Sequence, residues 1–154
     1  MGSLGTHIIL PSYFSPSKFG LVDMRTSDNR FLFFLPWNNA VLVGTTDRKF
    51  GINEKIPVTP YPPEEDILWL LSEARKYIHP SLEMKRHDVL SAWCGIRPLA
   101  LGGDVSTAEL NSAQVSRDHV VCSFKDGFLE GDSSIVVYVT GGKWTTYRKM
   151  FVFY

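Results

Sequence analysis

Residues 30–43 read RFLFFLPWNNAVLV, and in this stretch two apolar runs flank the turn-forming residues Pro36-Trp37-Asn38-Asn39. Turn residues at this spacing favour an antiparallel β-hairpin, with strands at Arg30–Leu35 and Ala40–Val43. Both runs are almost continuously apolar, which is typical of a sheet that is covered on both faces. The stretch therefore predicts a sheet that is buried on both faces.

Other short segments of the chain also have the composition of strands. These segments are His7–Leu10, Val89–Trp93, His119–Phe124 and Ile135–Thr140. The first of them stops at Pro11. Two polar segments between the strands, Ser12–Lys18 and Gly102–Ala113, are predicted to be loops.

One helix is predicted in the middle of the chain. Pro62 and Pro63 precede three acidic residues at 64–66, and acidic side chains favour the first turn of a helix. Apolar residues then recur at helical spacing, at Ile67, Leu70, Leu71, Ala74 and Ile78. The pattern predicts a long amphipathic helix that ends before Pro80. The predicted fold class is α+β, a mostly antiparallel or mixed sheet with this helix packed on it.

The composition is that of a globular chain without a strong net charge. Of its 154 residues 44% are hydrophobic, and 16 basic residues balance 16 acidic ones. This balance gives no electrostatic reason to expect nucleic acid as a partner. No apolar run approaches the ~20 residues that cross a bilayer, and the N-terminal residues lack the pattern of a signal peptide. Cys94 and Cys122 form no CxxC pair, so free thiols in a reducing compartment are predicted, with Cys94 buried.

Two arginines are candidate ligands of an anion. Arg97 precedes Pro98, which disfavours helical backbone at the arginine and holds it extended at a strand end. Arg117 precedes another predicted strand, so the two guanidinium groups can converge from sheet ends on one dianion such as phosphate. The alternative is that each is a surface arginine paired with a carboxylate. The histidines have no metal-ligand spacing, and no metal site is predicted.

A second candidate site is the turn Gly141-Gly142-Lys143, which follows a predicted strand and precedes a predicted helix start at Trp144. Backbone N–H groups at such a turn favour negative charge, and Thr145 and Thr146 could add hydroxyl contacts. The turn is not a Walker A loop, because Val137 stands where that motif needs its first glycine. A plain turn with an exposed lysine is the alternative.

Several motifs in this chain resemble those of the FAD-dependent glycerol-3-phosphate dehydrogenases. In chain order they are Gly5–Pro11, Arg30–Trp37, Gly44-Thr45-Thr46-Asp47, Trp93–Leu99, Ser116–His119 and Gly141–Lys149. Each motif alone is weak evidence for the family. The motifs nevertheless occur in the same order as in the family and extend over nearly the whole chain, which makes coincidence unlikely. The resemblance implies the substrate domain of a flavoprotein related to glutathione reductase and the amino-acid oxidases. The motif at residues 44–47 is explained as a turn with a capping aspartate.

The resemblance implies roles for individual residues. Arg97 and Arg117 would bind the phosphate of the substrate. His7 matches a histidine near the flavin, and would take the proton of the substrate hydroxyl as hydride leaves; a half-buried strand histidine is the alternative. The flavin and substrate would also contact residues of the diglycine turn, with the lysine stabilising the anionic reduced flavin. These residues are Gly142, Lys143, Thr145 and Thr146.

The implied activity is oxidation of sn-glycerol 3-phosphate to dihydroxyacetone phosphate with FAD, with electrons passed to quinone, in a homo-oligomer at the mitochondrial inner membrane. Because no strand followed by GxGxxG is found, the N-terminal Rossmann part is expected to be absent and the chain to be an internal fragment. Residues 1–140 would form the substrate-binding domain, residues 141–150 a returning segment of the FAD domain and residues 151–154 an atypical tail. Such a fragment is expected to be inactive, to retain no FAD, and to contact a membrane only through missing regions.

Two other functions stay open. An amino-acid-oxidase-like flavoenzyme would bind a carboxylate, for which one arginine usually suffices, so the pair Arg97 and Arg117 argues against it. A non-catalytic ligand-binding domain is the second alternative.

Overall fold

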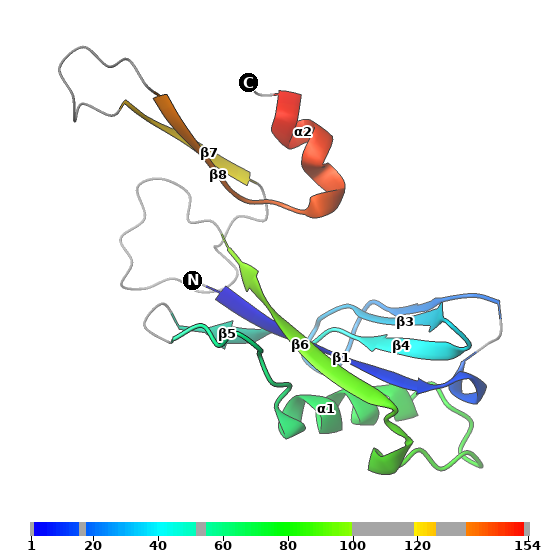
Figure 1. The fold of residues 1–154 in the computed structure, drawn as a ribbon. Coiled ribbons are helices and arrows are strands. Elements are labelled where there is room, and N and C mark those ends of the chain that lie inside the picture. Colours follow the sequence, from blue (N-terminus) through cyan, green and yellow to red (C-terminus); the bar gives the residue numbers. More distant parts are fainter. Residues whose placement is uncertain (1, 16–17, 52–54, 100–118, 126–134, 153–154) are drawn as a thin grey trace. The chain divides into compact units, whose positions relative to one another are not determined.

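The computed structural model divides the chain into two compact units (Figure 1). The first is Leu4–Arg97, which we call the sheet unit; the second, the hairpin unit, is Met1–Ser3 together with Pro98–Tyr154. The residues that the structure describes are 2–15, 18–51, 55–99, 119–125 and 135–152. The assignment of residues 1–140, 141–150 and 151–154 to parts of two domains stays a prediction.

The predicted hairpin is confirmed, but Pro36 and Trp37, which were expected in the turn, belong to the first strand. β3 (Leu32–Trp37) pairs antiparallel with β4 (Ala40–Gly44), in a register that sets the last residue of β3 opposite the first of β4. Between them lie Asn38 and Asn39, with φ angles of 45° and 58°. These left-handed conformations are those of a type I′ turn, which asparagine tolerates and whose twist matches that of the strands.

β1 (Gly2–Pro11) is the strand with the most neighbours in this sheet. The strand order is β2-β3-β4-β1-β5, and β6 also pairs with β1. The remaining strands are β2 (Leu21–Asp23), β5 (Arg48–Phe50) and β6 (Ser91–Pro98). Short 3-10 helices lie at η1 (Ser12–Phe14) and η2 (Arg86–Asp88). Two predicted strands are thus confirmed with different bounds, since β1 begins earlier and β6 extends further than the sequence pattern indicates.

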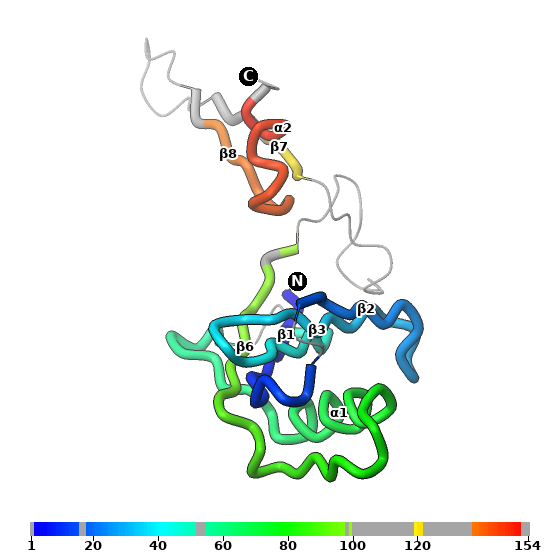
Figure 2. Tube along the Cα trace, turned by 90° about the vertical axis from the view of Figure 1, so that its right-hand side faces the viewer, coloured from blue at the N-terminus to red at the C-terminus, as the bar shows by residue number. Residues whose placement is uncertain are grey.

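Helix α1 (Glu64–Arg75) covers one face of the sheet (Figures 1 and 2). It begins with the three acidic residues, as predicted, and its buried apolar residues pack against the inward-facing residues of β1, β3 and β4. These helix residues are Ile67, Leu70, Leu71 and Ala74. At 12 residues α1 is shorter than the long helix predicted, and Ile78 lies beyond its end. The amides of Lys76 and Tyr77 bond to carbonyls three residues back, which tightens the chain into a 3-10 turn at this end.

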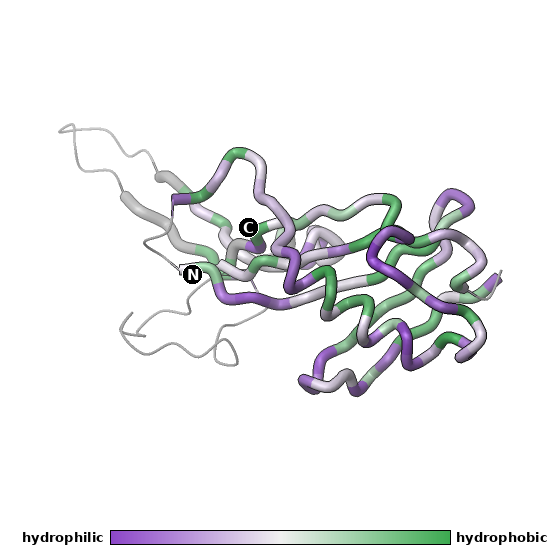
Figure 3. The backbone as a smooth tube through the Cα atoms, turned by 90° about the horizontal axis from the view of Figure 1, so that it is seen from below, coloured by the Kyte–Doolittle hydropathy of each residue, from purple (hydrophilic) through white to green (hydrophobic). Residues whose placement is uncertain are grey.

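The opposite face of the sheet has exposed apolar side chains, so the prediction of a sheet covered on both faces is wrong for the residues that the structure describes. Along β3, Leu32 and Phe34 are buried, whereas Phe33, Leu35 and Trp37 are 41%, 40% and 59% exposed. Side chains alternate between the two faces of a strand, and α1 covers only one face. Hydrophobic stretches are visible along this unit in Figure 3. We call the side of Phe33, Leu35 and Trp37 the open face.

The hairpin unit contains a second antiparallel pair, β7 (His119–Lys125) with β8 (Ile135–Gly141), and both strands were predicted. After β8 come the 3-10 helix η3 (Trp144–Thr146) and the short helix α2 (Tyr147–Val152). The predicted helix start after the diglycine is therefore confirmed. The predicted loop Gly102–Ala113 lies outside the described residues. Neither of the α-helices in the described part of the chain has the length and apolar character needed to cross a membrane.

Candidate functional site

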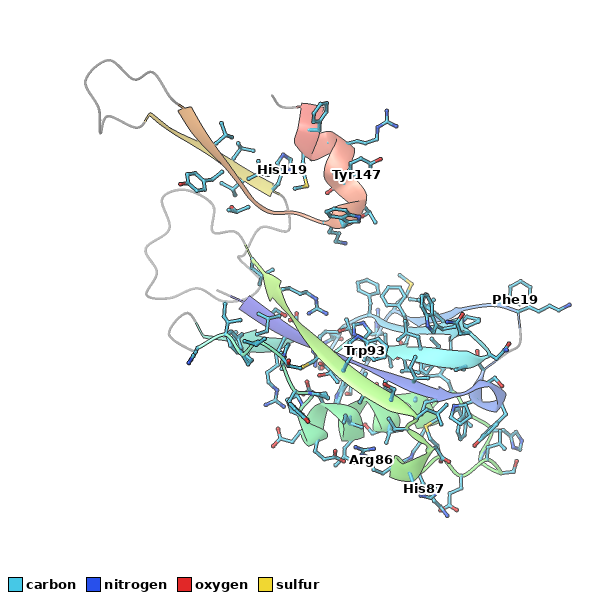
Figure 4. The ribbon with its side chains drawn as sticks, in the orientation of Figure 1. Phe19, Arg86, His87, Trp93, His119 and Tyr147 are labelled. Atoms are coloured by element: carbon cyan, nitrogen blue, oxygen red, sulfur yellow. The ribbon has the colours of Figure 1, made fainter. Side chains whose placement is uncertain are left out.

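His7 lies on the open face, in one row of the sheet with Gly44 of β4 and Phe33 of β3. Its ring stacks on that of Trp93 from β6, which Figure 4 labels; the ring centroids are 5.6 Å apart and the planes differ by 12°. A Cβ atom at Gly44 would overlap the His7 ring, so glycine lets the imidazole lie against the β4 backbone. Trp93 and the bare backbone of Gly44 thus hold the ring in place.

The protonation of His7 is set by its surroundings. Its pKa is lowered from the ordinary 6.5, first by burial and then by the positive charge of Arg97. Both effects disfavour the imidazolium ion. The ring is therefore neutral at pH 7, and one of its nitrogens can accept a proton. The half-buried position fits a structural histidine as well, but the electrostatic coupling to Arg97 links His7 to the predicted anion ligand.

Arg97 approaches the same part of the sheet unit from the end of β6. Its Nη2 donates a hydrogen bond to Oγ1 of Thr45 at 2.7 Å, and its Nη1 lies 3.7 Å from Oδ1 of Asp47. Both η nitrogens are 3.5 Å from the backbone oxygen of Thr46. A Cβ atom at Gly5 would overlap the guanidinium, so this glycine leaves room for it beside β1. The Arg97 side chain remains 39% exposed, which leaves it accessible to an anion from solvent.

The turn at residues 44–47 is anchored to helix α1 through a buried carboxylate. Thr46 Oγ1 accepts a bond from the amide of Thr6 at 2.9 Å and donates one to Asp66 Oδ2 at 2.9 Å. Asp66 also accepts bonds from Thr6 Oγ1 at 2.8 Å and Arg48 Nη2 at 2.9 Å. Burial alone would raise the pKa of Asp66, but the hydrogen bonds from Arg48, Thr6 and Thr46 outweigh it and lower the pKa below 3.8. The carboxylate is therefore ionised and holds the turn in place.

The structure brings His7 and Arg97 into one site. Arg117 lies outside the described residues, so its pairing with Arg97 stays a prediction. The other predicted ligand residues belong to the hairpin unit. They are Gly142, Lys143, Thr145 and Thr146.

In the hairpin unit the diglycine turn links β8 to η3. Gly141 and Gly142 have φ angles of 73° and 78°, in the left-handed region that favours glycine. The Lys143 amide donates to Thr146 Oγ1 at 3.4 Å, and that hydroxyl donates back to the Lys143 carbonyl at 2.8 Å. The Thr146 hydroxyl therefore caps its own turn, and the side chains of Lys143, Thr145 and Thr146 are all exposed. Lys143 and Thr145 are the better candidates for contacts with a ligand.

Sequence reasoning missed Trp93 and Thr45 as parts of the site. Both lie in motifs that it singled out, but the turn at residues 44–47 was assigned to a capping aspartate. In the structure Asp47 faces Arg97 and Thr45 bonds to it. One signal was present in the sequence. Trp93 and Arg97 are an even number of positions apart on one strand, which places them on the same face.

Cys94 has the structural position that its sequence predicts. It is buried on β6, and burial together with the negative charge of Asp66 raises the pKa of its thiol. The thiol is protonated at neutral pH, so Cys94 is no activated nucleophile. Within the described ranges, no group of three or more His, Cys, Asp or Glu side chains could hold a metal ion.

Known proteins are similar to this chain in sequence. Residues 1–143 match the model of the family described as FAD dependent oxidoreductase. Over 148 residues the chain is 45% identical to the mitochondrial glycerol-3-phosphate dehydrogenase of Mesocricetus auratus and 43% identical to that of Homo sapiens. The identity to the corresponding Saccharomyces cerevisiae protein is 42%. These matches cover 96% of this chain but only 18%, 18% and 21% of the three relatives.

A solved structure is similar in fold as well. The glycerol-3-phosphate dehydrogenase from Bacillus halodurans, complexed with FAD, superposes with a TM-score of 0.66 at 28% identity. The match covers 97% of this chain and 24% of that one. This likeness and the antiparallel sheet confirm the predicted α+β class. The chain spans less than a quarter of the length of each of these proteins.

Proposed function

The chain belongs to the FAD dependent oxidoreductase family, and we propose that it forms the substrate-binding part of a glycerol-3-phosphate dehydrogenase. The reaction is oxidation of sn-glycerol 3-phosphate at its secondary hydroxyl to dihydroxyacetone phosphate. The observation that supports this most is the neutral imidazole of His7 electrostatically coupled to the guanidinium of Arg97 on the open face. The names of the relatives described above support the choice of substrate.

Arg97 is the proposed ligand of the substrate phosphate. A guanidinium is planar and permanently charged, and its geometry matches that of phosphate oxygens. In this chain Thr45 and Asp47 contact the guanidinium itself. Arg117 is the proposed second cation, because a phosphate dianion is best matched by two positive charges. The cation pair would favour glycerol 3-phosphate over a substrate with a single carboxylate.

His7 is the proposed base, which accepts the proton of the secondary hydroxyl. Its lowered pKa keeps it neutral and ready to accept this proton at neutral pH. The charge of Arg97 opposes formation of the imidazolium, but a phosphate dianion bound to Arg97 would offset that charge. Substrate binding would therefore make proton uptake by His7 more favourable.

FAD, when bound, supplies the hydride acceptor for this oxidation. Two features of the chain fit it. The open face offers apolar surface next to His7, which suits a flat aromatic ring system. The turn after β8 ends at Lys143, which offers an exposed positive charge for an anionic group. Lys143 and Thr145 would contact flavin and substrate, while Thr146 would hold the turn.

The same proposal includes a mitochondrial location, electron transfer to quinone and a homo-oligomeric enzyme. The location is supported by the printed names of the mammalian and yeast relatives. Quinone, the inner membrane and the oligomeric state are supported by the family resemblance of the sequence motifs.

The phosphate role of Arg97 is tested in the complete flavoprotein that contains this sequence. We expect Arg97→Ala to raise the KM for glycerol 3-phosphate about 10²-fold with normal flavin content, because charge-assisted bonds to phosphate are lost. Arg86→Ala is the matched control, since Arg86 on η2 is an exposed arginine paired with Glu64 of α1. Loss of flavin with an unchanged KM would show that the phosphate site lies elsewhere.

Flavin retention tests whether the 154-residue chain suffices for activity. The purified chain is expected to be colourless and inactive, because it spans less than a quarter of its relatives. A yellow protein with turnover would contradict this.

A further inference from the structure

The turn at residues 44–47 contacts Arg97 through three consecutive residues. Thr45, Thr46 and Asp47 have oxygen atoms at 2.7, 3.5 and 3.7 Å from the guanidinium nitrogens. Of these, only the Thr45 contact is short enough for a strong charge-assisted hydrogen bond. The contacts of Thr46 and Asp47 are longer. Of these three residues, Thr45 therefore constrains the guanidinium most.

We propose that Thr45 is a positioning residue, which fixes the orientation in which the guanidinium of Arg97 meets the substrate phosphate. This inference rests on the proposed phosphate-binding role of Arg97. It adds a residue that acts through the arginine and contacts neither substrate nor flavin.

The hydroxyl of Thr45 is itself oriented. Thr45 Oγ1 lies 3.0 Å from the carbonyl oxygen of Thr46, to which it donates its proton. A hydroxyl that donates in one direction presents its lone pairs in others, and Arg97 Nη2 donates to one of them. Threonine is also stiff at χ1, since its Cβ is branched. The acceptor that faces Arg97 therefore has a defined place.

The backbone that bears Thr45 is held by bonds to other elements. The next residue, Thr46, bonds to the buried carboxylate of Asp66 on α1 and to the amide of Thr6 on β1. On the other side of the guanidinium, Gly5 leaves the space that a Cβ would fill. A continuous series of contacts thus leads from the helix through the turn to Arg97.

A pre-oriented guanidinium has an effect on binding rather than on the chemical step. Arginine loses much rotamer freedom when its side chain is immobilised, and a side chain that is already fixed loses less when the ligand binds. Removal of the Thr45 hydroxyl should therefore weaken phosphate binding while leaving the reaction of the bound substrate nearly unchanged.

The test compares Thr45→Val, which has nearly the same shape but no hydroxyl, with Thr45→Ser, which keeps the hydroxyl. In the flavin-loaded protein that contains this sequence, Thr45→Val is expected to raise the KM for glycerol 3-phosphate about tenfold. The kcat and the flavin content should stay close to those of the unmodified protein, and Thr45→Ser should restore the KM. If Thr45 only stabilised the fold, Thr45→Val would instead lower the flavin content or the kcat. An unchanged KM in Thr45→Val, or a Thr45→Ser variant as impaired as Thr45→Val, overturns the inference.

Arg97→Gln separates this inference from the proposed function. If Arg97→Gln leaves the KM unchanged, the phosphate site itself is misplaced and the proposed function fails. If Arg97→Gln raises the KM and Thr45→Val does not, only the positioning role of Thr45 is overturned.

A second measurement applies if Thr45→Val prevents flavin loading. The charge of Arg97 lowers the pKa of His7, so NMR titration of the His7 ring in the 154-residue chain reports where the guanidinium lies. Both Thr45→Val and Arg97→Gln should shift the titration midpoint upward, and Thr45→Ser should not. An unshifted midpoint in Thr45→Val, alongside a shifted one in Arg97→Gln, decides against the inference.

Discussion

The imidazole ring of His7 stacks on the indole ring of Trp93, with their centroids 5.6 Å apart and their planes 12° from parallel. The two residues come from β1 and β6, which are far apart in the sequence and adjacent in the sheet. The stack contributes to the burial that lowers the pKa of His7. A base that has to be neutral at pH 7 benefits from this arrangement.

Trp93→Ala should raise the pKa of His7 toward its ordinary value of 6.5, because the exposed ring regains solvation of its charged form. NMR titration of the ring protons measures this directly. Trp93→Phe is the matched control, since it keeps an aromatic ring and should leave most of the shift in place. Equal midpoints in all three proteins would mean that Trp93 does not shield His7.

Gly44→Ala should displace the imidazole from the sheet, because the new Cβ would overlap it. We expect loss of the ring-current shift that Trp93 induces in the His7 protons, and a loss of stability of about 1–3 kcal/mol from overpacking. Gly95→Ala on β6 is the control, since nothing lies within 4 Å of its added Cβ. A Gly44→Ala variant with unchanged His7 chemical shifts would contradict the packing described here.

Asp66→Asn should lower the free energy of unfolding by about 1–3 kcal/mol, because the buried site loses charge-assisted bonds to Arg48, Thr6 and Thr46. The pKa of Asp66 is lowered in the folded state, so its contribution is complete above the ordinary value of 3.8. That contribution is lost as the pH falls below 3.8 through the folded-state pKa. Urea unfolding as a function of pH should therefore show less acid sensitivity in Asp66→Asn.

Glu65→Gln is the control for this measurement. Glu65 bonds to the same Arg48 but its side chain is 82% exposed, and exposed ion pairs contribute little, about 0–1 kcal/mol. If both variants lose the same stability, burial of Asp66 is not the reason for its effect.

Leu70→Ala should destabilise the sheet unit by about 2–5 kcal/mol, since Leu70 is fully buried between α1 and the sheet and its removal leaves a cavity. Leu68 is in the same helix but 49% exposed, so Leu68→Ala should change stability far less. Urea unfolding of the two variants compares them. Similar losses would indicate that α1 does not use the face described for its packing.

Asn39→Ala should reduce stability by about 1 kcal/mol, because alanine is disfavoured at the positive φ of 58° in the β3–β4 turn. Asn39→Gly should be at least as stable as the unmodified chain, since Asn-Gly is a preferred type I′ pair. Thermal unfolding distinguishes the two. A stable Asn39→Ala variant would argue against the left-handed turn.

The parts of the fold that were predicted correctly have local causes. The turn at Asn38-Asn39 and the acidic start of α1 depend on residues next to one another in the chain, so both could be predicted from the sequence. The length of α1 could not be predicted, because Ile78 continues the apolar spacing although it lies beyond the end of the helix. Contact with the same core explains its apolar character without helical backbone.

The sequence motifs named two residues of the candidate site. His7 and Arg97 were recognised through motifs, but the contacts that orient them come from Trp93 and Thr45, which lie on other segments. The continuous apolar character of β3 predicted burial on both faces, whereas Phe33 and its neighbours on the open face are exposed. An apolar face is stabilised by burial, but its residues do not specify whether another part of this chain covers it.

The sequence by itself determined the longer strands, the hairpin turn, the helix start and the residue types at the candidate site, because propensity, turn chemistry and motif order are properties of neighbouring residues. It did not indicate the three-residue strands β2 and β5. Only the tertiary structure decided which face of the sheet is open. It also decided that Gly44 lies beside His7, that Gly5 lies beside Arg97, and that the turn at residues 44–47 contacts the arginine. These relations depend on the pairing of β1 with β4 and β6, and pairing between distant strands is set by the packing of the whole sheet.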